Sequence, residues 1–202
     1  MSDLTLAVGR PTLADKLFSR SIATDIVLIF AGVALIAIAA QIALPLLPVP
    51  ITGQTLAVLL VGTALGATRG GISLALYALL GLIGLPIFAA ASSGWSVIAG
   101  PTGGYIVGFI LAAILTGWLA QRRWDRRFVG TFVSFLAGSA VIYAVGLPWL
   151  AVSLASLNQP HDVGTVLSSG LYTFIPGDIV KALIAAGLLP LVWKFSGRRA
   201  AR

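Results

Sequence analysis

Long runs of apolar residues recur from one end of this sequence to the other, and short segments that hold most of the charged residues separate them. A water-soluble domain carries about 25% charged residues, whereas this chain of 202 residues carries 9%. The first run is followed by others like it, so it is not a cleavable signal peptide. We expect an all-α membrane protein with six transmembrane helices, near residues 23–44, 52–68, 70–85, 101–121, 128–149 and 172–194.

The second and third runs are marginal in length, because a helix needs about 20 apolar residues to cross a bilayer. Arg69, Gly70 and Gly71 separate these two runs. A charge that is costly in lipid is more easily placed at the end of a span than in its middle. Short, tilted or re-entrant helices are therefore an alternative for this part of the chain.

Basic residues lie on alternate connections between the expected helices. The first, third, fifth and last of these segments hold Arg10, Lys16, Arg20, Arg69, Arg122, Arg123, Arg126, Arg127, Lys194, Arg198, Arg199 and Arg202. The connections near 45–51, 86–100 and 150–171 hold neither Lys nor Arg. Because basic loops stay in the cytoplasm, we expect a cytoplasmic N-terminal segment (1–22), a six-helix domain (23–195) in the inner membrane, and a cytoplasmic C-terminal tail (196–202). The arginine cluster at 122–127 is then a cytoplasmic anchoring loop rather than a nucleic-acid site.

Several kinds of chemistry have no basis in the sequence. There is no cysteine, and phosphate-binding loops, metal-ligand spacings and nucleophile elbows are missing. We therefore expect no catalytic residues, no metal and no cofactor, and the energy for any active uptake must come from a partner or an ion gradient. An intramembrane enzyme would need a paired carboxylate, a Ser–His pair or a metal cluster, and Asp178 is the only acid expected deep in a span.

Asp178 and Lys181 form the strongest candidate site. Their i, i+3 spacing places both on one helix face, and that face must turn inward because lipid penalises charge. The pair could bind a small polar ligand, or it could be a structural tie between helices. Helices two, four and six would all begin at the outer side, where their N-termini favour anionic groups. Further polar candidates at this level, each of which could instead be a cap, belt or connector residue, are Gln54, Ser92, Ser93, Trp95, Thr102 and Tyr105.

Four segments carry a resemblance to a known family: PVPITGQT (48–55), GLIGLPIF (81–88), GPTGGY (100–105) and PGDIVK (176–181). In this order they resemble the BioY family, the biotin-specific S components of energy-coupling-factor (ECF) transporters. The resemblance implies a six-helix S-component fold, biotin bound near the outer face with Asp178 and Lys181 holding it, and no enzymatic activity. It also implies partners, a transmembrane coupling (T) protein and ABC-type ATPases, although some members are thought to work without the full module. An S component for another vitamin and a structural membrane subunit are the alternatives.

Small residues on the first helix are the expected docking face for the coupling protein. S components are known for an Ala-x-x-x-Ala pattern there, which lets two helices pack closely. In this chain the strict spacing occurs only as Ala39 and Ala43, toward the outer end of the helix. A looser stripe lies nearer the cytoplasm and consists of Ala31, Ala34 and Ala37.

Overall fold

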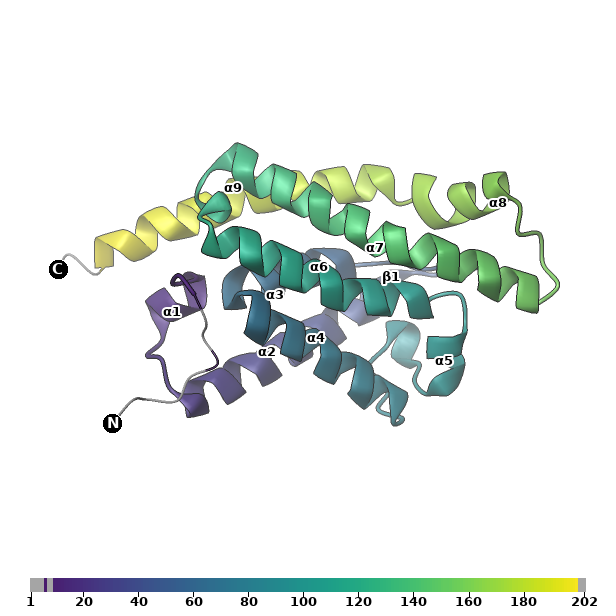
Figure 1. Ribbon diagram of the computed structural model, residues 1–202, viewed down its shortest axis with the longest axis horizontal. Helices are drawn as coiled ribbons and strands as arrows, with labels where there is room; N and C mark the ends of the chain where they lie inside the picture. Colours follow the sequence, from purple (N-terminus) through teal and green to yellow (C-terminus); the bar gives the residue numbers. More distant parts are fainter. Residues whose placement is uncertain (1–5, 7–8, 200–202) are drawn as a thin grey trace.

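The computed structural model describes residue 6 and residues 9–199 as a bundle of helices (Figure 1). The outermost parts of both expected terminal segments, residues 1–5, 7–8 and 200–202, lie outside the described residues. In chain order the helices are α1 (Leu13–Leu17), α2 (Ile22–Gln41), α3 (Gln54–Leu65), α4 (Ala67–Leu82), η1 (Ala89–Ala91), α5 (Trp95–Ala99), α6 (Gly103–Gln121), η2 (Trp124–Arg126), α7 (Phe128–Ser156), α8 (Val163–Leu167), η3 (Ser168–Tyr172) and α9 (Ile175–Arg199). Two short strands, β1 (Ala43–Leu44) and β2 (Ile51–Thr52), pair antiparallel with Ala43 opposite Thr52.

Each of the six expected apolar runs is a helix in the structure. Within the described residues, four segments are long and apolar enough to cross a membrane: Ile22–Gln41, Gly103–Gln121, Phe128–Ser156 and Val163–Ser196. The chain is therefore a multi-pass membrane protein. The marginal second and third runs are α3 and α4, with 12 and 16 residues, which is shorter than the roughly 17–25 residues of a straight span.

The fifth helix is longer than the sequence interpretation placed it. α7 continues to Ser156 instead of ending near residue 149, although it contains Pro148. Neighbouring helices can satisfy the carbonyl that such a proline leaves free, so a proline does not have to end a helix within a membrane protein. The connection that follows is correspondingly shorter, and α8 and the π-helical turn η3 occupy most of it.

Arg69 corrects the expected boundary between the second and third helices. Gly66 is the single residue between α3 and α4, and Arg69 lies in the first turn of α4 with only 2% of its surface exposed. Its Nη1 donates to Asp25 Oδ1 at 3.0 Å, and its Nη2 donates to Asp15 Oδ1 at 2.9 Å. These two ion pairs offset the desolvation of the guanidinium, and therefore the charge can lie inside a helix rather than in a loop.

Asp25 is consequently a second buried acid in a membrane-length helix. It lies in the first turn of α2 and is 0% exposed. From the sequence, Asp178 is the only acid expected deep in a span; Asp25 lies at the end of its helix, and its burial was not predicted. Asp15, on the short helix α1 outside the spans, joins the same cluster. Burial opposes the ionisation of Asp15, yet the hydrogen bonds from Thr12 and Arg20 and the charge of Arg69 lower its pKa overall.

Helix α6 runs through the middle of the bundle and packs against α3, α4 and α7 (Figure 1). Small residues permit this close packing. A Cβ atom on Gly62 of α3 would lie 2.4 Å from the carbonyl oxygen of Ala113, and one on Gly108 would lie 3.0 Å from the Cα atom of Ile142. Close backbone approach through small residues is typical of helix pairs in membranes.

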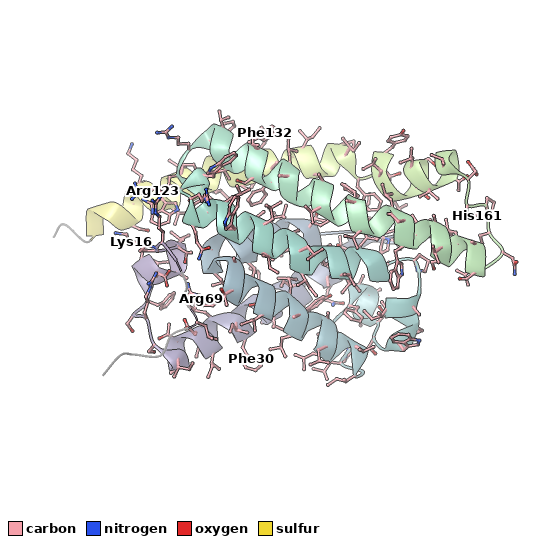
Figure 2. All side chains as sticks on the ribbon, viewed as in Figure 1. Lys16, Phe30, Arg69, Arg123, Phe132 and His161 are labelled. Atoms are coloured by element: carbon pink, nitrogen blue, oxygen red, sulfur yellow. The ribbon has the colours of Figure 1, made fainter. Side chains whose placement is uncertain are left out.

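The two ends of the bundle differ in charge. Lys16, Arg69 and Arg123 lie at the end where α1 and the last turns of α9 are found, whereas His161 lies at the opposite end (Figure 2). We call the first the basic end and the second the non-basic end, because none of the connections there contains Lys or Arg.

Asp125 occupies the connection between α6 and α7 at the basic end. It is 2% exposed and accepts a hydrogen bond from Trp193 Nε1. The guanidinium of Arg126 lies 4.1 Å from the centre of the Trp193 ring. Burial raises the pKa of Asp125 to about 6, although the Trp193 hydrogen bond and the Arg126 charge act in the opposite direction.

Candidate functional site

A cavity of about 250 Å³ lies between α3, α6, α7 and α9, beneath the connections that precede α3 and α6. Most of its wall is apolar, and Phe109, Ile106 and Ile142 form much of the inner part. The polar residues that line it are Thr52, Gln54, Thr55, Ser92, Ser96, Thr102, Tyr105, Tyr143 and Lys181. An apolar enclosure with a few convergent polar groups is the usual form of a small-molecule site.

Asp178 and Lys181 lie in the first turns of α9 and interact as the sequence spacing predicted. Lys181 Nζ is 3.5 Å from Asp178 Oδ1. Lys181 lines the cavity, while Asp178 lies directly behind it with 6% of its side chain exposed. A partly buried ion pair of this kind is costly to desolvate unless further hydrogen bonds complete it.

Two hydroxyl groups complete the pair from other helices. Thr55 of α3 donates its hydroxyl to Asp178 Oδ1 at 3.3 Å and accepts from Lys181 Nζ at 2.6 Å. Tyr143 of α7 donates its hydroxyl to Asp178 Oδ2. Lys181 also donates to the carbonyl oxygen of Thr52 at 3.1 Å. The result is a four-residue network of Thr55, Tyr143, Asp178 and Lys181, which we call the charged network and which joins α3, α7 and α9.

Gln54 lines the cavity, and its amide nitrogen and oxygen each bond to another part of the protein. Its Nε2 donates to the Tyr77 hydroxyl at 2.7 Å, and its Oε1 accepts from the Thr52 hydroxyl at 3.0 Å. Tyr77 in turn donates to the carbonyl oxygen of Ile87 at 3.1 Å. Gln54 therefore fixes α3 to α4 and to the connection above the cavity.

The other predicted polar residues divide into two groups. Tyr105, Thr102 and Ser92 line the cavity, and their hydroxyls donate to the carbonyl oxygens of Gly170, Val97 and Ala89. Ser93 and Trp95 are not among the lining residues, and Trp95 is 69% exposed. The structure thus brings six of the eight predicted residues to the cavity or its charged network.

The connection over the cavity is held firmly in place. Gln41, at the end of α2, donates from Nε2 to the carbonyl oxygen of Phe88 at 3.1 Å and accepts from the Ala91 amide at 2.9 Å. The Phe88 ring is 1% exposed and packs edge-on against Tyr77, with ring centres 5.4 Å apart. Ala90 and Ala91 both adopt positive φ angles, which non-glycine residues rarely do. The outer cover is therefore a defined structure with a small-residue tip.

Thr55 and Tyr143 are the members of the charged network that the sequence interpretation did not select. Thr55 stands next to Gln54 in the PVPITGQT segment. Tyr143 is the one tyrosine in the apolar run of α7. A tyrosine inside such a run needs a hydrogen-bond partner for its hydroxyl. This requirement is the sequence signal that could have selected Tyr143. Among the described residues, no three His, Cys, Asp or Glu side chains come together as metal ligands.

The alanines expected to dock a coupling protein occupy different faces of α2. Ala31 and Ala34 are exposed, Ala37 and Ala43 are half-buried, and Ala39 is 8% exposed inside the bundle. Ala43 belongs to β1 rather than to the helix. The strict Ala39 and Ala43 spacing therefore does not form an exposed helical stripe, whereas Ala31 and Ala34 lie on the surface.

Comparison with known proteins agrees with this architecture. Residues 11–198 match the model of the BioY family. The chain is 40% identical to "Biotin transporter BioY" of Thermotoga maritima over 161 residues, which cover 79% of this chain and 90% of that protein. It is 37% identical over 163 residues to "Probable biotin transporter BioY" of Pyrococcus horikoshii, covering 81% and 92%.

A solved structure has the same fold. It is described as the S-component for biotin from an ECF-type ABC transporter, and it aligns with a TM-score of 0.72 and 26% identity over 85% of this chain and 92% of that one. The resemblance carried by the four sequence segments is thereby confirmed, and the chain belongs to the BioY family.

Proposed function

We propose that this protein captures biotin with high affinity and takes it across the cytoplasmic membrane as the substrate-binding subunit of an ECF transporter. The observation that carries the proposal is the charged network at the wall of the one cavity that α3, α6, α7 and α9 enclose in the described part of the chain. The relatives named as biotin transporters and the solved S-component for biotin support the choice of ligand.

The chemistry of biotin suits this cavity. Its ureido ring has two N–H donors and one carbonyl acceptor, which correspond to the carboxylate of Asp178 and the ammonium of Lys181. Its fused thioether ring and aliphatic chain match the apolar wall that Phe109 and Ile142 provide. We assign Gln54, Ser92, Thr102 and Tyr105 to the same site, since they line it. Ser93 and Trp95 belong to the outer cover rather than to the contact surface.

We further propose six membrane crossings, with both termini and the basic end in the cytoplasm. The separation of charge between the two ends supports this orientation (Figure 2). The short helices α3 and α4 pack together and against α6, so protein rather than lipid covers much of their surface. In this arrangement residues 1–22 and 196–202 are the cytoplasmic segments and the inner membrane holds residues 23–195.

The partners in this proposal are a transmembrane coupling (T) protein and ABC-type ATPases. The sequence lacks a phosphate-binding loop, so the isolated chain should bind biotin but hydrolyse no ATP. We place the docking face on the exposed side of α2 at Ala31 and Ala34, because Ala39 is already buried within the chain.

Purification followed by ligand identification tests the function. We expect mass spectrometry of the purified protein to find co-purified biotin, and calorimetry of the ligand-free protein to give tight binding with one biotin per chain. A protein that binds a different vitamin and not biotin would overturn the ligand. A protein that binds no vitamin at all would favour the structural-subunit alternative, in which the charged network only ties α3, α7 and α9 together.

A further inference from the structure

We infer that this site recognises the ureido head of biotin and does not read the charge of the carboxyl end, so that uncharged and N-substituted carboxyl derivatives are also ligands. The inference rests on the proposed function and extends its substrate class to biotin amides, including the amide formed with the side-chain amine of lysine. Three observations and the charge balance of the site carry it.

The single cation of the cavity wall already has partners. Lys181 is the only basic residue among the described residues that line the cavity. Its ammonium lies 3.5 Å from the carboxylate of Asp178, 3.1 Å from the carbonyl oxygen of Thr52 and 2.6 Å from the hydroxyl of Thr55. A ligand therefore meets a cation whose charge Asp178 balances.

In the part of the chain that the structure describes, the connections near the mouth of the cavity provide no second cation. The segments between α2 and α3 (42–53), between α4 and α6 (83–102) and between α7 and α9 (157–174) contain neither Lys nor Arg. Their one histidine, His161, lies at the far tip of the molecule (Figure 2), and its Nδ1 is 3.0 Å from the carbonyl oxygen of Gln159. Asp162 follows it in the sequence, so the non-basic end provides no positive field for a carboxylate.

Charge balance then fixes the orientation of the ligand. The ureido group is neutral, and its carbonyl oxygen can accept from Lys181, which lines the cavity, without disturbing the mutual neutralisation of Lys181 and Asp178. A carboxylate in the same place would add a second anion beside the nearly buried Asp178, with one ammonium to serve both. Burial of an uncompensated anion is strongly unfavourable. The carboxyl end must therefore point away from the charged network, toward the solvent.

A second groove gives the carboxyl end room to extend. Pro48 and Pro101 line both the cavity and this groove, which has a volume of about 550 Å³ and continues past Leu157, Gln159 and Thr165. The groove is uncharged among its described lining residues. The groove therefore adjoins the cavity at these two prolines, and a substituent on the carboxyl carbon that passes them would meet no charged group there.

Competition binding to the purified, ligand-free, full-length protein tests the inference. The ligands are biotin, biotinamide, the lysine amide of biotin, and 2-iminobiotin, in which a nitrogen replaces the ureido oxygen and makes the head cationic at neutral pH. We expect the two amides to bind within about fivefold of biotin, because neither loses a bond to the protein. We expect 2-iminobiotin to bind about a hundredfold more weakly, because its protonated head has no acceptor for the Lys181 ammonium.

The outcomes separate the inference from the function on which it rests. If biotin binds tightly but both amides bind more than about thirtyfold more weakly, the carboxylate is read by charge and the inference is wrong. If biotinamide matches biotin while the lysine amide fails, the second groove does not accept the tail and that part of the inference is wrong. If 2-iminobiotin matches biotin, the assigned orientation is reversed. Failure of biotin itself to bind would instead remove the proposed function.

Discussion

Replacing Asp178 by asparagine should weaken biotin binding while leaving the protein folded. The substitution keeps the shape of the side chain and one oxygen, which can accept from either Tyr143 or Thr55 because these two hydroxyls bond to different oxygens of Asp178. It removes the negative charge that balances Lys181 at 3.5 Å. A hydrogen bond to a charged group contributes about 1.5–3 kcal/mol. We therefore expect the Kd for biotin to rise roughly tenfold to a hundredfold.

Thermal unfolding in detergent, with and without biotin, together with calorimetric titration, measures both consequences. At a fixed saturating biotin concentration, a hundredfold rise in Kd lowers the stabilisation by the ligand by about 2.7 kcal/mol. The ligand-free protein should lose less stability than this, because Lys181 keeps its bonds to Thr52 and Thr55 and is 19% exposed. Lys181→Ala should also weaken binding, with a larger loss of stability because it empties volume.

Asp162→Asn is the matched control. It makes the same substitution at an acid of the non-basic end of the molecule. Asp162 does not line the cavity, and it accepts hydrogen bonds from Thr165 within its own turn. Its affinity for biotin should be unchanged. If Asp178→Asn folds, loses stability without ligand, and binds biotin as tightly as the wild type, then the charged network is only a tie between helices and the reasoning is refuted.

Three further predictions concern the basic end and the orientation of the chain. Arg69→Met should lower the free energy of unfolding by about 3–5 kcal/mol, because it leaves Asp25 buried at 0% exposure without its ion-pair partner. The control is Arg122→Met, at an exposed arginine, which should change the free energy of unfolding by less than about 1 kcal/mol. Equal losses for the two variants in a denaturant titration would contradict the role of the buried ion pairs. Burial raises the folded-state pKa of Asp125 from 3.8 to about 6, so the folded protein holds this proton more tightly than the unfolded chain does. The free energy of unfolding therefore falls by up to about 3 kcal/mol as the pH rises from 3.8 to 6. Asp125→Asn should therefore be more stable than the wild type at neutral pH, and the difference in unfolding free energy between the two proteins should shrink as the pH falls through this window. A difference that is constant with pH would contradict the raised pKa of Asp125. Reporter fusions at residue 125 and at the C-terminus should both report the cytoplasm, and an external signal from either would require a different number of membrane crossings.

The positions of the apolar helices could be predicted because helix formation in a membrane depends on local composition. In lipid no water can bond to the backbone N–H and C=O groups, so a run of apolar residues must be helical there. The charged residues stand at the ends of these runs. The i, i+3 spacing of Asp178 and Lys181 is equally local, and the ion pair follows from it. The four segments that resemble the family were likewise visible in the linear sequence, and the comparisons confirm the family.

Contacts between distant parts of the chain could not be predicted in this way. Thr55 is 123 residues from Asp178 and Tyr143 is 35 residues from it; their convergence depends on how α3, α7 and α9 rotate when they pack. Ser93 and Trp95 failed to reach the cavity for the same reason, since a position near the right membrane depth does not fix which way a side chain points. The number of crossings, the orientation and the role of each site residue remain predictions for the experiments above.

Arg69 shows most clearly what the sequence determines and what the packing of the helices decides. Its sequence position beside two glycines favoured a helix end, because an arginine in lipid is costly. Arg69 does lie at a helix end, in the first turn of α4, and there the tertiary structure provides Asp25, 44 residues away, and Asp15, 54 residues away, whose carboxylates stabilise the buried guanidinium. Sequence alone therefore determined which segments are apolar helices and where charge is expensive; the packing of those helices decided which charges are neutralised, because only the folded chain brings the opposite charges within reach.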